Sequence, residues 1–321
     1  RSSYSESFRA PSLRELGGQP FIQIFQFVLG GDTTPTRLIL NEAGPPAGDI
    51  RPESSDTFSA GFDWSLPALN GWEMSGTYFR TKFDNRLGKP DPTGGFAALS
   101  DPAAFGEFFI FDPTPAQVAD LIGNSPIGSD SLGLNSQDPA VIAAGVDALV
   151  DLRSRNLLRS EVEGFDFTLA HTGSLGTFDT NASLNAAYIF DSKQQATQAA
   201  GEITTVDIVT QPVDLRLRGS LGVGRNACTA NAVITYVDDT EDRFAATPAS
   251  VDSWTVLDLN ASYTFAGSSN AALEGLKLGL GVRNVFDTPP PEVERSALGN
   301  QGLTRPIGYD PTNASPLGRF F

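Results

Sequence analysis

Cysteine, histidine and methionine each occur once in the 321 residues of the chain. The single cysteine, Cys228, excludes an intramolecular disulfide and a multi-cysteine metal site. The single histidine, His171, stands beside the turn sequence TGSLG and cannot by itself form a histidine metal site or complete a catalytic triad. We therefore expect no metal site, no cofactor and no enzymatic activity.

Positive charge is also scarce, since 22 Lys and Arg face 38 Asp and Glu, for a net charge of -16. This balance excludes the electrostatic footprint of a nucleic-acid-binding protein. The acidic run DDTEDR at 238–243 could bind Ca²⁺ through its carboxylates, but it has neither the spacing nor the glycine turn of an EF-hand. We interpret it as a solvated loop, with calcium bridging to lipopolysaccharide as an alternative.

No apolar run approaches the roughly 18 residues of a membrane-spanning helix. That test does not detect strands, because alternating residues average out in a hydropathy window. The 32 Gly and 22 Pro favour many short strands joined by turns over a helical protein. The chain begins at Arg1 in the middle of a pattern, without an initiator Met or a signal peptide, so we expect it to be part of a longer protein.

Hydrophobic residues recur with a period of two. In TFSAGFDWSL, Phe58, Phe62 and Trp64 fall on one face, and Thr57 and Asp63 on the other. Similar stretches predict strands near 57–66, 72–87, 162–171, 177–191, 211–223, 226–238, 253–265 and 275–286. We expect them to form one curved antiparallel sheet in which each strand pairs with its neighbour in sequence.

The connections between these strands alternate in length. Short ones lie at 67–71, 172–176, 224–226 and 266–274, and long ones at roughly 9–53, 88–160, 192–211, 238–252 and 287–317. This alternation is typical of an outer-membrane barrel, whereas the Greek-key links of a soluble sandwich follow no such rule. The placement of aromatic residues toward strand ends agrees with interfacial belts. A soluble protein whose apolar faces form a core remains the alternative.

The connection 88–160 contains two helix signals. Thr114-Pro115 precedes AQVADLI and Gly123, and Asp138-Pro139 precedes AVIAAGVDALVDL. Each reads as an N-cap followed by proline in the first helical position. We expect two short helices within a surface loop; a buried helix pair of a soluble domain is the alternative.

Five stretches, in order along the chain, resemble motifs of the TonB-dependent outer-membrane receptors. RNVFDTPPP at 283–291 resembles the signature that ends the next-to-last strand of that family, and GRFF at 318–321 would open the last strand. The other four are YSESFRAPSLREL at 4–16, RPESSDTFSAGFDW at 51–64, NLLRSEVEGFDFTL at 156–169 and VDSWTVLDLNASYTF at 251–265. The motif positions are Phe8, Arg9, Pro11, Asn284, Phe286 and Asp287.

The resemblance implies an all-β fold: part of a transmembrane, antiparallel, up-and-down β-barrel with short periplasmic turns, long extracellular loops and short helices in one loop. Residues 1–321 would be the C-terminal portion of the barrel, with the last strand truncated and the plug domain, the TonB box and the first barrel half absent. The implied function is a Gram-negative outer-membrane receptor that binds a scarce nutrient, such as a ferric siderophore, and imports it with energy transmitted by TonB. A secreted or surface β-sheet binding or adhesion protein is the alternative.

The resemblance also implies partners: the TonB complex acting through the missing plug region, the plug domain, outer-membrane lipid and lipopolysaccharide, and a small-molecule ligand. Candidate ligand contacts are Arg9, Phe96, Phe108, Phe109 and Tyr309, although the loop aromatics could equally pack the loops on themselves. We expect Phe58, Phe62, Leu184, Leu215, Leu217, Leu259, Leu278, Leu280, Val282 and Phe286 to face lipid. The opposite, concave face is expected to carry Asp63, Asp166, Asn185, Arg216, Asp258 and Arg283.

Overall fold

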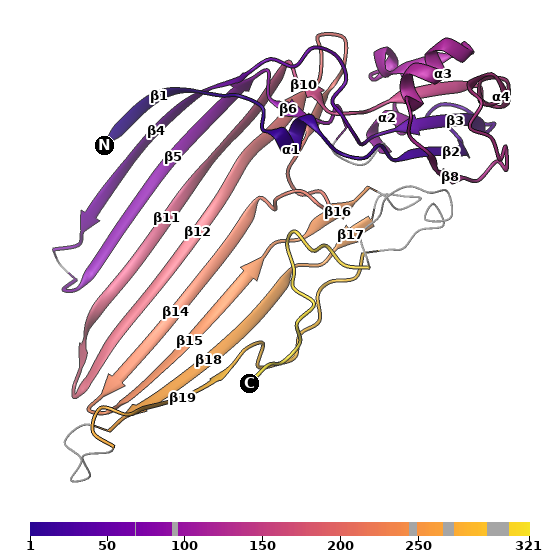
Figure 1. Ribbon diagram of the computed structural model, residues 1–321. Coiled ribbons are helices and arrows are strands. Elements are labelled where there is room, and N and C mark those ends of the chain that lie inside the picture. The colour runs from indigo at the N-terminus through magenta and orange to yellow at the C-terminus, as the bar shows by residue number, and fades with distance from the viewer. Residues whose placement is uncertain (68, 92–95, 244–248, 266–272, 294–307) are drawn as a thin grey trace.

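The computed structural model describes residues 1–67, 69–91, 96–243, 249–265, 273–293 and 308–321. A long, curved sheet dominates the shape of the molecule, and a mixed α/β part lies beyond one end of its strands (Figure 1). Among the described residues no helix is both long and apolar enough to cross a membrane.

The main sheet is antiparallel and its strands follow the order β1-β4-β5-β11-β12-β14-β15-β18-β19. Their bounds are β1 Ser2–Arg9, β4 Glu53–Ser65, β5 Trp72–Asp84, β11 Arg159–Leu175, β12 Phe178–Gln195, β14 Leu215–Arg225, β15 Cys228–Val237, β18 Trp254–Thr264 and β19 Lys277–Val282. The short β13 (Glu202–Thr204) pairs with β12 beside this path. Each of the eight strands predicted from alternation is present, and the pairing of neighbours in sequence is confirmed.

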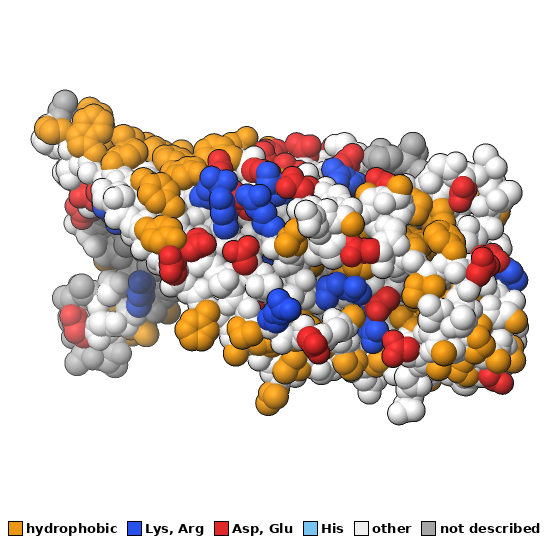
Figure 2. Space-filling model, turned by 90° about the horizontal axis from the view of Figure 1, so that it is seen from above, with side chains coloured by type: hydrophobic (Ala, Val, Ile, Leu, Met, Phe, Trp, Pro, Cys, Tyr) orange, Lys and Arg blue, Asp and Glu red, His pale blue; other side chains and the backbone are white. Residues whose placement is uncertain are grey.

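One face of this sheet is apolar. The register places Leu169 opposite Leu184, and Leu259 opposite Val282, so apolar side chains continue from strand to strand. The predicted lipid-facing residues are exposed, including Phe58, Phe62, Leu184, Leu259, Leu278, Leu280 and Phe286, while Leu215, Leu217 and Val282 are half-buried. Hydrophobic side chains line one margin of the molecule over the sheet (Figure 2). No second sheet covers this apolar face within the described ranges, as the soluble alternative would require.

The opposite, polar face carries the residues predicted for it. Asp63, Asp166, Asn185, Arg216 and Arg283 are exposed and Asp258 is half-buried. Cross-strand contacts on this face are polar, for example Ser183 Oγ to Ser220 Oγ at 2.8 Å. The sheet thus separates an apolar surface from a polar one, as a barrel wall does.

Short turns lie at one end of the strands and long connections at the other. Gly176-Thr177 joins β11 to β12, and Asn226-Ala227 joins β14 to β15. Gly71, in the turn between β4 and β5, has φ +80°, and a Cβ there would lie 2.0 Å from the carbonyl oxygen of Thr172, so only glycine fits. Most of the predicted turn at 266–274 lies outside the described residues.

The five long connections fold together into the mixed part, which we call the cap. It comprises the described residues of connections 10–52, 85–158, 196–214, 238–253 and 283–319. Its sheet has the order β7-β9-β3-β2-β8, with β2 parallel to β8 and β3 parallel to β9. The elements are α1 Leu13–Leu16, β2 Ile22–Phe27, β3 Thr36–Asn41, β6 Leu87–Gly88, α2 Phe96–Ser100, the 3₁₀ helix Gly106–Phe108, β7 Phe109–Phe111, α3 Pro115–Ile122, β8 Ile127–Asp130, α4 Pro139–Gly145, β9 Ala148–Asp151, β10 Arg155–Asn156, β16 Thr240–Asp242 and β17 Ala249–Val251.

The two predicted helices are α3 and α4. In α3, Thr114 and Gln117 form a capping box, and the helix ends at Gly123 as predicted. The second helix is shorter than its sequence suggested, because it stops at Gly145 and the following Ala148–Asp151 pairs with β3 and β7. Tertiary pairing has overridden the apolar helical pattern there.

Buried apolar residues pack on both faces of the cap sheet. One cluster lies under α3 and α4 and includes Ile22, Ile24, Ile39, Val118, Leu121, Ile142 and Leu149. The other lies on the opposite face and includes Phe25, Leu38, Leu40, Leu99, Phe108, Val150, Leu157, Ile203, Val209, Val251 and Val293. The second cluster draws on all five long connections, so the cap is built jointly by segments far apart in sequence.

Candidate functional site

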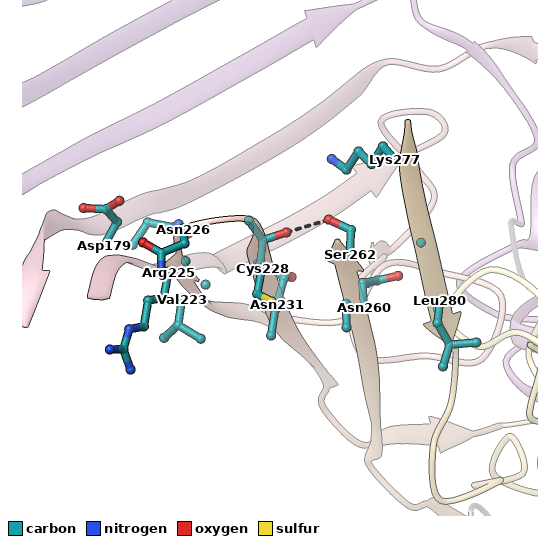
Figure 3. Close-up of a pocket in the computed structure, with 18 residues that line it drawn as sticks. Asp179, Val223, Arg225, Asn226, Cys228, Asn231, Asn260, Ser262, Lys277 and Leu280 are labelled. Atoms are coloured by element: carbon teal, nitrogen blue, oxygen red, sulfur yellow. Dashed lines mark hydrogen bonds between the residues drawn. The ribbon is translucent and has the colours of Figure 1, made fainter. Parts of the chain in front are cut away.

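A recess of about 620 Å³ lies on the polar face near the short turns. Its floor comes from β12, β14, β15, β18 and β19 (Figure 3). Register aligns Asn181, Gly222, Asn231, Asn260 and Gly281 in one row across these strands. The floor is therefore made of amide side chains and glycines, with Asp179 and Lys277 near its ends.

Glycine makes this floor flat. A Cβ on Gly222 would lie 2.5 Å from Oδ1 of Asn181, and one on Gly281 would lie 2.6 Å from Oδ1 of Asn260. Each asparagine side chain thus lies over the glycine of the neighbouring strand. In the adjacent row, Thr229 Oγ1 and Ser262 Oγ share a hydrogen bond of 2.7 Å (Figure 3).

The side-chain amide groups of Asn181, Asn231 and Asn260 make no hydrogen bond with any part of the chain that the structure describes. An asparagine side chain offers one acceptor and two donor hydrogens, the same groups as a peptide. The floor can therefore bind neutral hydrogen-bonding groups through these side chains, beside apolar residues such as Val223 and Leu280 that also line the recess.

Nearer the cap, the polar face carries arginines on β14. Arg216 and Arg218 are exposed and lie on the same face of the strand. Arg216 Nη2 donates to Oδ1 of Asn313 at 3.0 Å, which ties the strand to the last connection. The polar face therefore changes from uncharged near the turns to positively charged toward the cap along this strand.

The motif Arg-Asn-Val-Phe-Asp forms the exit from β19. Asn284 is 5% exposed with φ +49°, and its side chain accepts from the Thr288 amide and donates to the Thr288 carbonyl, both at 2.9 Å. Asp287, with φ +56°, accepts from the amide of Arg319 at 2.7 Å. Arg283 and Phe320 then exchange backbone hydrogen bonds, so Phe320 lies beside β19 as the GRFF prediction expects. The motif therefore organises a turn, and its Phe286, 72% exposed, lies free on the surface.

The residues predicted for ligand contact are scattered rather than gathered. Arg9 pairs with Glu53, at 2.8 Å between Nη2 and Oε1. Phe108 and Phe109 are buried, and the Arg155 guanidinium lies 4.6 Å from the Phe108 ring centre. These two rings pack the cap on itself, which was the alternative for the loop aromatics. Tyr309 is half-buried, and Phe96 opens α2 with its side chain outside the described residues.

The remaining motif positions belong to the first connection and its strand. Phe8 is 84% exposed near the cap end of β1, and Pro11 is half-buried just beyond it. The sequence analysis does not identify Glu53, whose carboxylate accepts hydrogen bonds from Arg9, although Glu53 belongs to the Pro-Glu-x-Ser motif. A buried carboxylate in a polar stretch carries no periodic signal that would mark it.

An acidic hollow of about 630 Å³ lies at the cap end among the third and fourth connections. Burial raises the pKa of Asp207, and the nearby carboxylates of Asp214 and Asp238 act in the same direction. Burial likewise raises the pKa of Asp214. The described residues contain no group of three or more metal-ligating side chains placed to hold an ion, the predicted 238–243 run included. The interpretation of DDTEDR as a solvated loop is wrong, because Thr240–Asp242 forms β16, which pairs with β17, and Asp242 is buried.

Elsewhere in the cap, charge pairs bind segments together. The Arg37 guanidinium donates to Asp147 at 2.5 Å, and this hydrogen bond lowers the pKa of the Asp147 carboxyl. The pair joins the start of β3 to the residue just before β9. Its role is to hold the cap sheet together.

Comparison with solved structures shows the same fold. The siderophore receptor PirA from Acinetobacter baumannii matches 99% of this chain at 15% identity, with a TM-score of 0.55, over 37% of its own length. The ferric enterobactin receptor PfeA from Pseudomonas aeruginosa matches 99% at 19% identity, with a TM-score of 0.51, over 36% of its length. A PfeA variant in complex with enterobactin matches similarly, at 18% identity and a TM-score of 0.52.

The chain thus spans about a third of the length of the structures it matches. No curated protein matches it. The family described as TonB dependent receptor-like, beta-barrel matches residues 1–285, which include four of the five motif stretches in full and the start of the fifth. Members of this family reside in the outer membrane of Gram-negative bacteria and are transporters without enzymatic activity. With its two-faced sheet and its motif turn at Asn284, the chain belongs to the β-barrel family of TonB-dependent receptors.

Proposed function

We propose that residues 1–321 form the C-terminal part of the barrel wall of a receptor that binds a ferric siderophore or another large, scarce solute and imports it with TonB-transmitted energy. The observation that carries this proposal is the two-faced sheet, apolar on one side and polar on the other, with short turns at one end and a folded cap at the other. A wall of this kind separates lipid from an aqueous lumen. The matched structures are a siderophore receptor and a ferric enterobactin receptor, which supports the solute class.

Each surface has a role in this proposal. The apolar face contacts outer-membrane lipid, and its exposed Leu278 and Leu280 would be an aggregation liability in water. The polar face lines the lumen, where the plug domain of the whole receptor would lie. The asparagine and glycine floor suits such a partner, because its free amides match backbone groups and its glycines permit close approach. The cap faces the outside, where the solute arrives.

The test is uptake by the whole receptor that contains this chain. We expect cells expressing it under iron limitation to accumulate ⁵⁵Fe supplied as ferric enterobactin, and to lose this accumulation when TonB is deleted. Accumulation that persists without TonB would overturn the energy coupling. If no iron enters in either strain while the receptor is folded in the outer membrane, ferric enterobactin is not its solute. Cells that carry an empty vector are the control for other uptake systems.

A further inference from the structure

The long connections of this barrel are joined by hydrogen bonds to one another as well as to the sheet. The first and second connections are linked from Gly30 N to Leu99 O at 2.9 Å and from Ala47 N to Ser154 O at 2.8 Å. They also supply the two parallel strand pairs of the cap sheet. Neither connection could leave its place without breaking a sheet shared with the other.

The third connection extends this network in both directions. The Gly201 amide donates to Ala104 O at 3.3 Å in the second connection, and the Val209 amide donates to Glu241 O at 3.1 Å in the fourth. Asp310 of the fifth connection, 4% exposed, accepts from the Thr210 amide at 3.1 Å. Every long connection is therefore bonded to at least one other.

Buried apolar side chains also link the five long connections to one another. The cluster around Phe25 and Leu40 continues through Leu157 and Val209 to Val251 and Val293, so one apolar core takes residues from all five connections. Those connections start from strands at both wings of the sheet, from β1 and β4 to β18 and β19. Segments that share hydrogen bonds and a continuous core unfold as one unit.

We infer that the five long connections form one cooperatively folded cap, which opens as a unit rather than loop by loop. It follows that the surface met by a solute is largely built before the solute arrives, and that no single connection closes over it alone. This inference rests on the proposed function only in naming a solute as the thing admitted. The folding behaviour of the cap can be measured without any solute.

The closing experiment is amide hydrogen exchange of the whole receptor, purified in detergent, carrying two new cysteines. A Cβ on Gly201 would lie 3.3 Å from the Cβ of Ala104, close to the separation in a disulfide, so Ala104→Cys with Gly201→Cys should cross-link the second and third connections. Cys228→Ser removes the one native thiol of this chain. The reduced form of the same protein is the matched control.

A cooperative cap predicts that oxidation slows exchange by about tenfold or more in all five connections, including Ile22–Phe27, which contains neither cysteine. Slowing confined to the neighbourhood of 104 and 201 would show that the connections open separately and would overturn the inference. A receptor that fails the uptake test can still give either result, so the two proposals fail independently.

A second variant needs no cross-link. Asp310→Ala removes the bond to Thr210, and we expect exchange to rise several-fold in the cap strands β2, β3 and β9 as well as near residue 310. Asp63→Ala is the control, because this carboxylate lies on the main sheet and pairs with Arg1 at 3.1 Å. Faster exchange limited to the third and fifth connections in Asp310→Ala contradicts a single cap.

Discussion

Arg9 and Glu53 form a bidentate ion pair, in which Nε donates to Oε2 at 3.1 Å and Nη2 donates to Oε1 at 2.8 Å. The two residues come from two motifs, Phe-Arg-Ala-Pro-Ser and Pro-Glu-x-Ser, and they face each other at the end of the β1–β4 ladder. Glu53 also accepts from the Leu87 amide at 2.8 Å. One carboxylate thus joins two strands of the barrel to the start of the second connection.

We predict that Arg9→Ala destabilises the receptor because it leaves the carboxylate of Glu53, 7% exposed, without its cation. Loss of one partner of a fully buried pair costs about 3–5 kcal/mol, but the Arg9 side chain is 53% exposed, so we expect about 1–2 kcal/mol. The measurement is thermal unfolding of the whole receptor in detergent. Arg1→Ala, whose pair with Asp63 is exposed on both sides, should change the unfolding temperature little.

The role of Arg9 illustrates what motif resemblance can predict. The motif placed Arg9 correctly at a strand end beside a long connection, since that depends only on alternation and connection length. Its partner, however, depends on the register that sets Arg9 opposite Glu53, with 43 residues of chain between them. Alternation in the sequence fixes which face a residue takes but not which residue lies across from it.

Gly30 is a second sensitive position, within the cap. A Cβ there would lie 1.5 Å from the carbonyl oxygen of Ser100, which is backbone and cannot move aside. Gly30→Ala should therefore separate the first connection from α2 and expose residues of the second connection to protease. Gly106→Ala is the matched control, because a Cβ on Gly106 meets no atom within 4 Å. Equal protease resistance in both variants would contradict this contact.

The assignment of faces predicts opposite responses from neighbouring residues. Leu184 lies on the apolar face of β12 and Asn185 on the polar face. Leu184→Arg places a cation in lipid and should cost about 2–4 kcal/mol if it lies near the middle of the bilayer. Asn185→Arg should cost much less, although it removes the bond accepted from Thr168 Oγ1 at 3.1 Å. Folding yield in the outer membrane and unfolding in detergent measure both, and similar losses would reverse or abolish the face assignment.

The cap marks where the sequence was least informative. β2 and β9 are buried on both faces, so IQIFQF and ALVD show little alternation and resemble either a short strand or part of a helix. Parallel pairs such as β3 with β9 join residues more than a hundred positions apart, and no local pattern encodes that contact. The capping residues Thr114 and Asp138 act within one turn, and for that reason the two helix starts were predicted correctly.

The acidic hollow should make the stability of the cap depend on pH. Burial raises the pKa of Asp207 and Asp214 in the folded state, so the folded protein binds protons more readily than the unfolded one in the range just above the ordinary value near 4. The free energy of unfolding should therefore rise as pH falls from 7 toward 4. In the double variant Asp207→Asn, Asp214→Asn, the melting temperature should depend less on pH between 7 and 4. Asp147→Asn should leave it unchanged, because the pKa of Asp147 is lowered and its contribution is lost only below that range.

The last prediction concerns residues 1–321 expressed by themselves. Within the described residues β1 pairs only with β4, and all eight of its residues are exposed, while β19 pairs with β18 and gains only the Arg283–Phe320 bridge on its other side. Unpaired strand edges template association, and in hydrocarbon each unpaired backbone group costs several kcal/mol. The apolar face, with Leu280 68% and Phe58 44% exposed, adds a second reason for association in water. We expect this polypeptide to aggregate without detergent, and in detergent to show β-structure without a sharp, heat-resistant transition. Size-exclusion chromatography and circular dichroism melts measure both, and a soluble monomer with a two-state transition would show that the apolar face is covered in solution.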